Sequence, residues 1–233
     1  MERVKTGITG LDEIMHGGIP AHQLLLVTGK AGTGKTVLCS QFMYHGALKY
    51  KQPGVYLTFE EPPQYIKENA RTFGWDFSAL EKKGIFSFIQ YDPYRAEDIL
   101  EIMESSIREI GAERVVIDSV SALGLHIRDQ EELRRMIFNM SLTLRRLKCT
   151  SIMTSEIVQG RPGLSRYGVE EFVSDSLLVF YYDRIQSSFS RAAQIWKLRG
   201  STHSEKLHPY EIGSHGITIN QHEEALAEEI SKR

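Results

Sequence analysis

Short apolar runs alternate with longer amphipathic stretches along most of the chain. The apolar runs have the length and the residue types of strands; they cover residues 24–27, 55–59, 85–90, 115–117, 151–154, 177–181 and 194–198. Apolar residues at helical spacing predict helices over residues 37–49, 63–73, 96–110 and 130–147. This alternation predicts an α/β fold with right-handed crossovers and a mainly parallel sheet covered by helices on both faces.

The pattern changes after Ser176, where apolar runs follow one another with short turns at Gly200, Gly213 and Gly216. Closely spaced strands predict antiparallel additions at the C-terminal edge of the sheet. Residues 223–233 are highly charged and predict a C-terminal helix or tail. A chain of 233 residues is long enough for one well-buried α/β domain and short for two, so we expect one domain with a core over about residues 6–219.

Composition narrows the classes of protein that fit. A hydrophobic content of 41% and a charged content of 25% are ordinary for a globular protein, and a net charge of −2 argues against a globally basic nucleic-acid binder. The sequence has neither an apolar stretch of about 18 residues nor the apolar core of a signal peptide, so we expect a cytoplasmic protein with no membrane partner. Cys39 and Cys149 lie in apolar surroundings and are expected to be packed, reduced thiols.

Residues 29–36 read G-K-A-G-T-G-K-T and fit the phosphate-binding loop pattern G-x-x-x-x-G-K-[ST] between a strand and a helix. Little side-chain bulk lets backbone amides converge on a polyanion, and the helix that begins near Lys35 adds its positive dipole end. Lys35 would contact the β- and γ-phosphates, and the hydroxyl of Thr36 would bind Mg²⁺. The alternative is a surface loop rich in Gly and Lys. The candidate phosphate ligands are Gly29, Lys30, Ala31, Gly32, Thr33, Gly34, Lys35 and Thr36.

Hydrolysis of a bound nucleotide also requires a metal ligand and a group that positions water, and acidic residues at two places in the sequence are candidates for these roles. Residues 114–119 read R-V-V-I-D-S, an apolar strand that ends in a carboxylate, and Asp118 would hold Mg²⁺ through water. A helix-capping role is the alternative for Asp118. Glu60 and Glu61 follow a strand directly before Pro62, and one of them would orient or deprotonate the attacking water. For this pair, residue chemistry alone leaves a solvated loop or an N-cap equally open.

Five further segments extend the pattern over most of the chain. They read T-G-I-T-G-L-D-E-I-M-H-G-G-I-P (6–20), T-F-E-E-P-P (58–63), N-A-R-T-F-G-W-D (69–76), R-Y-G-V-E-E-F-V-S-D (166–175) and K-L-R-G-S-T-H (197–203). Together they resemble a KaiC domain, a branch of the RecA superfamily of ATPases, from about Thr6 to Ile219. The resemblance implies a RecA-like P-loop NTPase fold that uses ATP or ADP and Mg²⁺. Clock proteins of this family carry two such domains in tandem, whereas this chain carries one. Glu171-Phe172 stands where the autophosphorylating domain has its Ser-Thr pair, so autokinase activity is not expected.

The resemblance also implies roles for individual residues. Glu60 and Glu61 match paired catalytic glutamates, and residues 29–37, through Val37, match the nucleotide element together with Asp118. In family hexamers the nucleotide lies between subunits, and Lys197 and Arg199 match cations that reach the neighbour's phosphates. Cations of this kind neutralise charge in the transition state. Further matching nucleotide contacts are Leu198, Ser201 and His203 on the adjacent subunit and Thr72 on the first. Without the resemblance, the alternation of K-L-R would favour a solvated strand edge.

Three functions remain open from the sequence. The first is an ATP-hydrolysing, oligomeric regulatory ATPase with slow turnover, which the resemblance implies to be a homo-hexameric ring. The second is a recombinase-like filament that binds DNA through the loop at 159–167; Gly160, Arg161, Pro162, Gly163 and Arg166 without an aromatic cluster support it weakly. The third is a nucleotide-gated scaffold with negligible turnover. A steep salt dependence of DNA affinity would indicate the second function, and steady-state phosphate release separates the first from the third.

Overall fold

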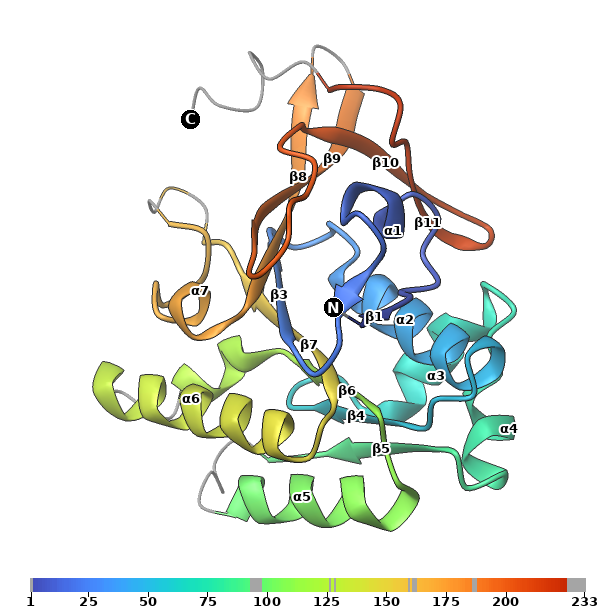
Figure 1. Cartoon of the computed structure of the whole chain (residues 1–233), viewed down its shortest axis with the longest axis vertical. Helices are drawn as coiled ribbons and strands as arrows, with labels where there is room; N and C mark the ends of the chain where they lie inside the picture. The colour runs from blue at the N-terminus through green and yellow to red at the C-terminus, as the bar shows by residue number, and fades with distance from the viewer. Residues whose placement is uncertain are drawn as a thin grey trace.

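The fold is built on a nine-stranded sheet (Figure 1). The structure is a computed structural model that describes residues 2–92, 98–125, 127, 129–158, 160, 163–185 and 188–225. Across the sheet the strand order is β11 (Gly216–Ile219), β10 (His208–Gly213), β9 (Ser188–Leu198), β8 (Ser176–Ile185), β3 (Leu24–Gly29), β7 (Thr150–Glu156), β6 (Arg114–Asp118), β4 (Gly54–Thr58) and β5 (Phe86–Gln90). Two short strands, β1 (Arg3–Val4) and β2 (Ile19–Pro20), pair separately.

Strand directions divide the sheet into two parts. The strands β8, β3, β7, β6, β4 and β5 are mutually parallel, whereas β9, β10 and β11 are added antiparallel beyond β8. The predicted parallel sheet with antiparallel strands at its C-terminal edge is therefore confirmed. Because the carboxyl ends of the parallel strands meet at one edge, loops that follow β3, β4, β6 and β7 come together there.

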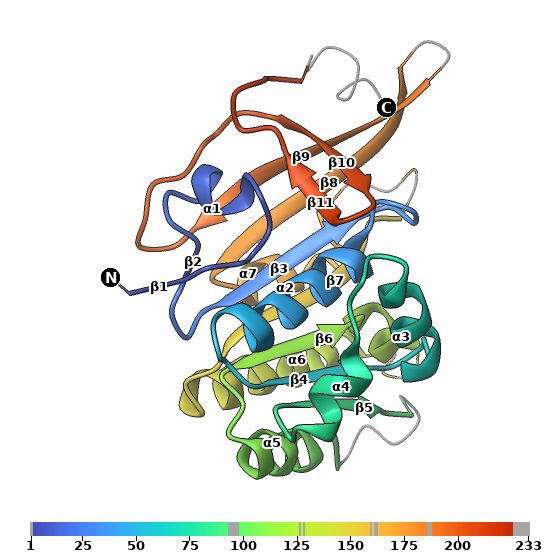
Figure 2. The same cartoon turned by 90° about the vertical axis from the view of Figure 1, so that its right-hand side faces the viewer.

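Helices cover both faces of the sheet (Figures 1 and 2). They are α1 (Leu11–Ile14), α2 (Lys35–Lys49), α3 (Pro63–Arg71), α4 (Phe77–Lys82), α5 (Ile99–Ile110), a 3-10 helix (Val120–Leu125), α6 (Gln130–Arg146) and α7 (Glu170–Val173). Side chains of β3 alternate between two cores: Leu25 and Val27 pack with α2, α3 and α4, and Leu24 and Leu26 pack with α5 and α6. The period of two residues along a strand explains why this run is apolar at every position.

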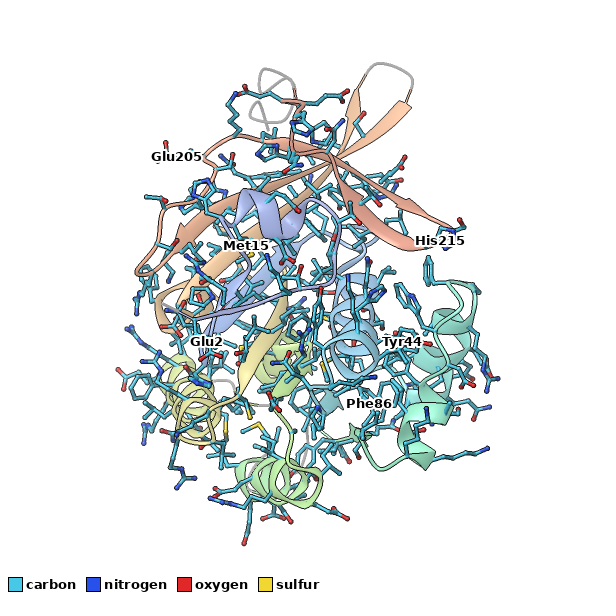
Figure 3. The ribbon with its side chains drawn as sticks, turned by 45° about the vertical axis from the view of Figure 1, so that its right-hand side comes forward. Glu2, Met15, Tyr44, Phe86, Glu205 and His215 are labelled. Atoms are coloured by element: carbon cyan, nitrogen blue, oxygen red, sulfur yellow. The ribbon has the colours of Figure 1, made fainter. Side chains whose placement is uncertain are left out.

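Aromatic rings join the first helical layer to the sheet. The ring of Phe77 lies with its centroid 5.6 Å from Tyr44 of α2 and 4.7 Å from Phe86 of β5, and Tyr44 stacks against Trp75 at 6.2 Å. Figure 3 labels Tyr44 and Phe86, whose side chains lie between α2 and the α3–α4 segment. This cluster fixes α2, and with it the loop that precedes α2, against the sheet.

Arg114 begins β6 and is fully buried. Its guanidinium donates to the side chain of Gln52 at 2.9 and 2.6 Å, to the carbonyl of Phe42 at 2.8 Å and to the carbonyl of Lys5 at 2.7 Å. Burial lowers the pKa of Arg114 to about 10. One side chain thereby ties the N-terminal segment, α2 and the connection before β4 together, and its hydrogen bonds offset the loss of hydration.

The sequence prediction succeeds for the strands of the main sheet and for the longer helices, and it misses the short helices and the separate pair of short strands. Each predicted strand overlaps an observed strand, and the predicted helices correspond to α2, α3, α5 and α6, with residues 93–97 outside the described part. The prediction missed β1, α1, β2, α4, the 3-10 helix and α7. Of the predicted tail, residues 226–233 lie outside the described residues, and the single-domain expectation stays a prediction. Both cysteines are buried, and no described helix is long and apolar enough to cross a membrane.

Candidate functional site

The loop between β3 and α2 has the shape that phosphate binding requires. Gly32 and Gly34 have φ of 80° and 88°, a backbone region that side chains disfavour, and a Cβ on Gly29 would lie 2.7 Å from the carbonyl oxygen of Phe180. The ammonium of Lys35 donates to the carbonyls of Gly29 at 2.9 Å and Lys30 at 3.1 Å, so it already lies within the curve of the loop. Burial lowers the pKa of Lys35, although Asp118 and Glu156 act against the shift.

The antiparallel strands brace this loop from outside. Lys30 forms an ion pair of 2.7 Å with Asp183 of β8, and the hydroxyl of Tyr210 on β10 donates to the carbonyl of Thr33 at 2.6 Å. Arg191 of β9 donates to the carbonyl of Gly32 at 3.4 Å. Sequence reasoning missed these supports, because nothing in their spacing indicates that the added strands reach the loop.

The structure brings Thr36 and Asp118 together. The hydroxyl of Thr36 donates to Asp118 Oδ2 at 2.9 Å, the hydroxyl of Tyr56 donates to the same oxygen at 2.7 Å, and Thr154 donates to Oδ1. Burial, followed by the charge of Asp118, raises the pKa of Tyr56 well above its usual value, so the phenol stays a donor. Hydroxyl and carboxylate oxygens are the ligands that Mg²⁺ prefers, and this ion usually keeps several waters, so the predicted pair fits Mg²⁺. Sequence reasoning missed Tyr56 and Thr154.

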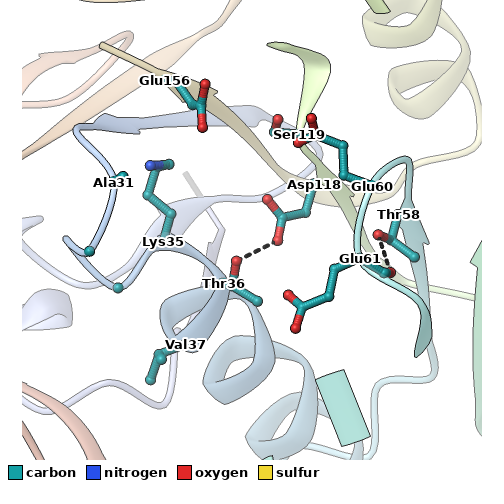
Figure 4. A pocket seen from close by; sticks show the side chains of 12 residues that line it. Ala31, Lys35, Thr36, Val37, Thr58, Glu60, Glu61, Asp118, Ser119 and Glu156 are labelled. Atoms are coloured by element: carbon teal, nitrogen blue, oxygen red, sulfur yellow. Dashed lines mark hydrogen bonds between the residues drawn. The ribbon is translucent and has the colours of Figure 1, made fainter. Parts of the chain in front are cut away.

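A cavity of about 330 Å³ lies in front of the loop (Figure 4). Its walls are Ala31, Gly32, Gly34, Lys35, Thr36, Val37, Thr58, Glu60, Glu61, Asp118, Ser119 and Glu156. The carboxyl groups of Glu60, Glu61, Asp118 and Glu156 surround the space beside Lys35 and Thr36 (Figure 4). Among the described residues that line the cavity, Lys35 is the one cation. Acidic walls around a single ammonium leave the site with an excess of negative charge.

Glu60 and Glu61 follow β4 and face this cavity together. Glu60 is exposed as a whole, but partial burial of its carboxyl group, then the charges of Glu156 and Asp118, raise its pKa. Burial, then the charge of Asp118, also raises the pKa of Glu61, whose Oε1 accepts from Asn69 Nδ2 at 3.2 Å. A raised carboxylate pKa brings proton affinity closer to what a general base needs near neutral pH.

A second cavity of about 280 Å³ adjoins the first and shares Thr36, Val37 and Glu61 with it. Its remaining walls are Ser40, Ile66, Asn69, Ala70, Thr72, Phe73 and Trp75. Thr72, predicted as a nucleotide contact, lines this cavity and donates to the carbonyl of Asn69 at 2.7 Å. The first cavity is thus acidic and polar, and the second has aromatic and aliphatic walls.

Lys197 and Arg199 lie near the amino ends of the parallel strands, whereas the phosphate loop follows the carboxyl end of β3. Leu198 pairs with Ser176, and Ser176 pairs with Leu25 at the start of β3, whereas the phosphate loop begins at Gly29. Four residues of strand separate the two levels by about 13 Å. Lys197 Nζ donates to the carbonyls of Glu171 at 2.5 Å and Ser174 at 2.6 Å. Within one chain, these cations lie apart from the phosphate loop.

The other residues predicted to contact the nucleotide of an adjacent subunit also lie outside the cavities. Leu198 is 4% exposed and packs in the core, and Ser201 accepts a hydrogen bond from Arg3. His203 Nδ1 lies 2.9 Å from the carbonyl of its neighbour Ser204. In the described part of the chain, these residues fall outside the walls of both cavities. Their predicted nucleotide contacts therefore require a second copy of the chain.

Comparisons with known sequences and structures show which protein family the chain belongs to. The family model for KaiC ATPases matches residues 4–224. The chain belongs to the KaiC family of ATPases. A crystal structure of a KaiC-like protein from Pyrococcus horikoshii superposes with a TM-score of 0.87 at 35% identity, over 94% of this chain and 99% of that one. The expected resemblance and the RecA-like fold are thereby confirmed, and the family implies nucleotide binding.

Relatives of two lengths match this KaiC-family chain. A UPF0273 protein of Methanocaldococcus jannaschii is 38% identical over 94% of this chain and 96% of its own length. The circadian clock oscillator protein KaiC of Synechococcus elongatus is 36% identical over 93% of this chain, but the match covers 44% of its length. This chain thus corresponds to slightly less than half of the clock protein.

Proposed function

We propose that this KaiC-family protein is a slow regulatory ATPase of the cytoplasm that binds ATP between copies of itself and releases ADP and phosphate. One observation carries the proposal: Lys35, Thr36, Asp118, Glu60 and Glu61, predicted separately from the sequence, line one cavity. A cation, a pair of metal ligands and two candidate bases around one space are the parts that phosphoryl transfer to water requires.

The nucleotide extends through both adjoining cavities. The triphosphate lies in the acidic cavity, where the loop amides and Lys35 bind it and Thr36 and Asp118 hold Mg²⁺. Bound Mg²⁺ neutralises phosphate charge, which the surrounding carboxylates would otherwise repel. The base and ribose enter the second cavity, where Thr72 and the rings of Phe73 and Trp75 contact them. Aromatic walls suit a planar base.

Glu60 and Glu61 position the attacking water and accept its proton. Their raised pKa values support this assignment, since a carboxylate with greater proton affinity is the better base. Glu61 is the better oriented of the two, because Asn69 donates to its carboxylate and Thr58 donates to its carbonyl at 2.8 Å. We therefore assign the water to the pair, with Glu61 as the more fixed member.

Lys197 and Arg199 complete the site of a neighbouring copy. The acidic cavity has one cation, whereas these two cations lie at the opposite edge of the sheet, where they contact backbone carbonyls. Head-to-tail association would bring the acidic edge of one copy to the basic segment of the next. Such an interface either closes into a ring or grows as a filament, and the family resemblance implies a ring of six members.

Assembly and turnover are tested together. We expect the mass of the protein to increase when ATP and Mg²⁺ are added, and phosphate release per chain to rise with protein concentration. Lys35→Ala serves as the control and should do neither, because the phosphate loop loses its cation. Concentration-independent turnover by a demonstrated monomer would exclude the shared site, and nucleotide-dependent assembly without phosphate release would indicate the scaffold.

The DNA-binding alternative receives no support from the described residues. Arg166 of the candidate loop forms an ion pair of 2.7 Å with Glu156, so its charge is neutralised within the chain. Gln159, Arg161 and Pro162 lie outside the described residues.

A further inference from the structure

A buried carboxylate lies between the nucleotide cavity and the Lys197–Arg199 edge, and the proposed mechanism does not use it. Glu170 is 1% exposed and begins α7. Its Oε1 accepts from Ser155 Oγ at 2.8 Å and its Oε2 accepts from Ser165 Oγ at 2.6 Å. The backbone amides of Tyr167 and Val169 also donate to it, at 3.4 and 3.1 Å. Among the described residues it has no ion-pair partner, so these hydrogen bonds keep the buried carboxylate in place.

One side of this network reaches the nucleotide cavity. Ser155 directly precedes Glu156, which lines the cavity and forms the 2.7 Å ion pair with Arg166. The backbone amide of Arg166 donates to Ser155 Oγ at 3.2 Å, so the same hydroxyl contacts both Arg166 and Glu170. The backbone of Arg166 is thus connected to Glu170 through Ser155 Oγ and through the adjoining amide of Tyr167.

The other side reaches the cations offered to a neighbouring copy. The amide of Ser174 donates to the carbonyl of Glu170 at 3.0 Å and closes α7. The carbonyls of Glu171 and Ser174 accept from Lys197, and the carbonyl of Phe172 accepts from Arg199 at 3.4 Å. The three residues of α7 that follow Glu170, together with Ser174, therefore help to determine where these two cations lie.

We propose that Glu170 is a positioning residue that links the nucleotide cavity of one subunit to the Lys197 and Arg199 which that subunit presents to its neighbour. This inference rests on the proposed function. Two arrangements of Arg166 account for the coupling. In the present one, Arg166 pairs with Glu156. When a triphosphate lies beside Glu156, the added negative charge repels Glu156 and offers Arg166 a phosphate partner, which guanidinium groups bind strongly.

The consequence is communication around the assembly. Nucleotide in one subunit moves Arg166, Glu170 transmits the movement to α7, and α7 changes the position of Lys197 and Arg199 at the next active site. Hydrolysis then depends cooperatively on ATP concentration, because each occupied site prepares its neighbour. Couplings between sites typically change ligand affinity by about 5- to 150-fold.

A label on α7 tests the first step of the coupling. Phe172 is 64% exposed, whereas Cys39 and Cys149 are buried, so Phe172→Cys can be labelled selectively with an environment-sensitive fluorophore. We expect ATP with Mg²⁺ to change the emission, and Arg166→Gln to abolish the change at equal nucleotide occupancy and equal assembly mass. Arg108→Gln, which removes the exposed ion pair with Glu104, is the matched control and should preserve it.

The outcomes separate this inference from the function on which it rests. The coupling is overturned if calorimetry shows nucleotide binding while emission at residue 172 stays unchanged, or if the emission change survives Arg166→Gln. Either result leaves the ATPase proposal intact. Absence of nucleotide binding overturns the ATPase proposal and the coupling with it.

Substitution of Glu170 tests the second step. Glu170→Gln keeps the shape of the side chain but replaces one acceptor oxygen by a donor, so the network loses hydrogen bonds on one side. We expect kcat to fall about tenfold and the Hill coefficient for ATP to approach one, with the nucleotide Kd unchanged. Ser165→Ala removes one donor to Glu170, together with the contacts of that hydroxyl to Glu171 and the amide of Gly168. It should give the same effects in weaker form and serves if Glu170→Gln does not fold. Wild-type kcat and cooperativity in a folded variant would overturn the inference.

Discussion

The two ends of the parallel strands differ in the charged side chains that the proposed function assigns to them. At the carboxyl end, Glu60, Glu61, Asp118 and Glu156 surround Lys35 in one cavity. At the amino end, Lys197 and Arg199 lie beside α7 and contact backbone carbonyls. About 13 Å of strand separates the two levels, so the two sets of charged side chains lie apart within one chain.

The comparison shows how catalysis can be made dependent on assembly. In the proposed function the acidic end binds phosphate and metal, and Lys35 is the one cation among the described residues that line its cavity, so the cations of a neighbour add charge that stabilises the transition state. The basic end has the cations but no phosphate loop. Substitutions that remove charge from one end at a time therefore test whether the two ends act as halves of one site.

The largest expected effect comes from removing the cation of the acidic end. Lys35→Ala should abolish measurable ATP binding, because a desolvated charge contact to the β- and γ-phosphates is lost. Calorimetric titration measures it. Lys49→Ala is the control, since Lys49 is exposed at the far end of α2 and lines neither cavity, so its loss should change affinity little. Unchanged affinity in Lys35→Ala would contradict the phosphate-loop assignment.

Removing a cation of the basic end should leave binding and reduce hydrolysis. Arg199→Ala is expected to lower kcat by about 10³-fold, the lower range for an arginine that acts on a neighbour's phosphate. Mixing this variant with the Glu60→Gln/Glu61→Gln variant, which is expected to keep nucleotide binding and therefore assembly, provides the sharper test. Random mixing of equal amounts places an intact cavity next to an intact Arg199 at about one quarter of the interfaces, so activity should return up to that fraction. No recovery in mixed assemblies of demonstrated composition would indicate that the glutamate pair and Arg199 act within one chain.

The paired glutamates should show a smaller loss. Replacing Glu60 and Glu61 by Gln is expected to lower kcat by about 100-fold with nucleotide Kd unchanged, because general base catalysis contributes on this scale. Single-turnover phosphate release measures the chemical step. Glu68→Gln on the exposed face of α3 is the matched control. Normal hydrolysis in the double variant would mean that other groups position the water.

The smallest expected effect is a shift in pH dependence. The pKa of Glu60 is raised above 4.5, so its base form disappears, and activity falls, at a higher pH than for an ordinary glutamate. The pKa of Glu60 is higher in the folded chain than in the unfolded chain, so between these two pKa values the native state binds more protons. The contribution of Glu60 to the free energy of unfolding therefore decreases as the pH rises through that window. Glu156→Gln removes one of the charges that raise the pKa and should move the acidic limb of the rate profile to lower pH. An unmoved limb would argue against Glu60 as the base.

Sequence reasoning predicted the parts of the fold that local pattern determines. The run at β3 is apolar on both faces and was recognised as a buried strand, and Gly32 and Gly34 were recognised as loop residues that need special backbone angles. The four-residue helices α1 and α7 were missed because one turn is too short to show a helical period.

Contacts between distant segments account for the missed site residues. Tyr56 and Thr154 reach Asp118 because β4 and β7 flank β6, and strand order follows from the whole sheet and not from local pattern. The position of Lys197 and Arg199 likewise follows from the antiparallel pairing of β9 with β8. Their roles, and those of Glu60 and Glu61, stay predictions until the variants are measured.

The place of β3 in the sheet has a consequence for synthesis on the ribosome. β3 carries the phosphate loop and is made early, yet its neighbours are β7 and β8, which end at Glu156 and Ile185. Pairing over such distances along the chain is slow and comes late in folding. A nascent chain that ends before residue 156 thus contains the whole loop motif without the strands that support it, and we expect the growing polypeptide to acquire affinity for ATP only after β8 has been made.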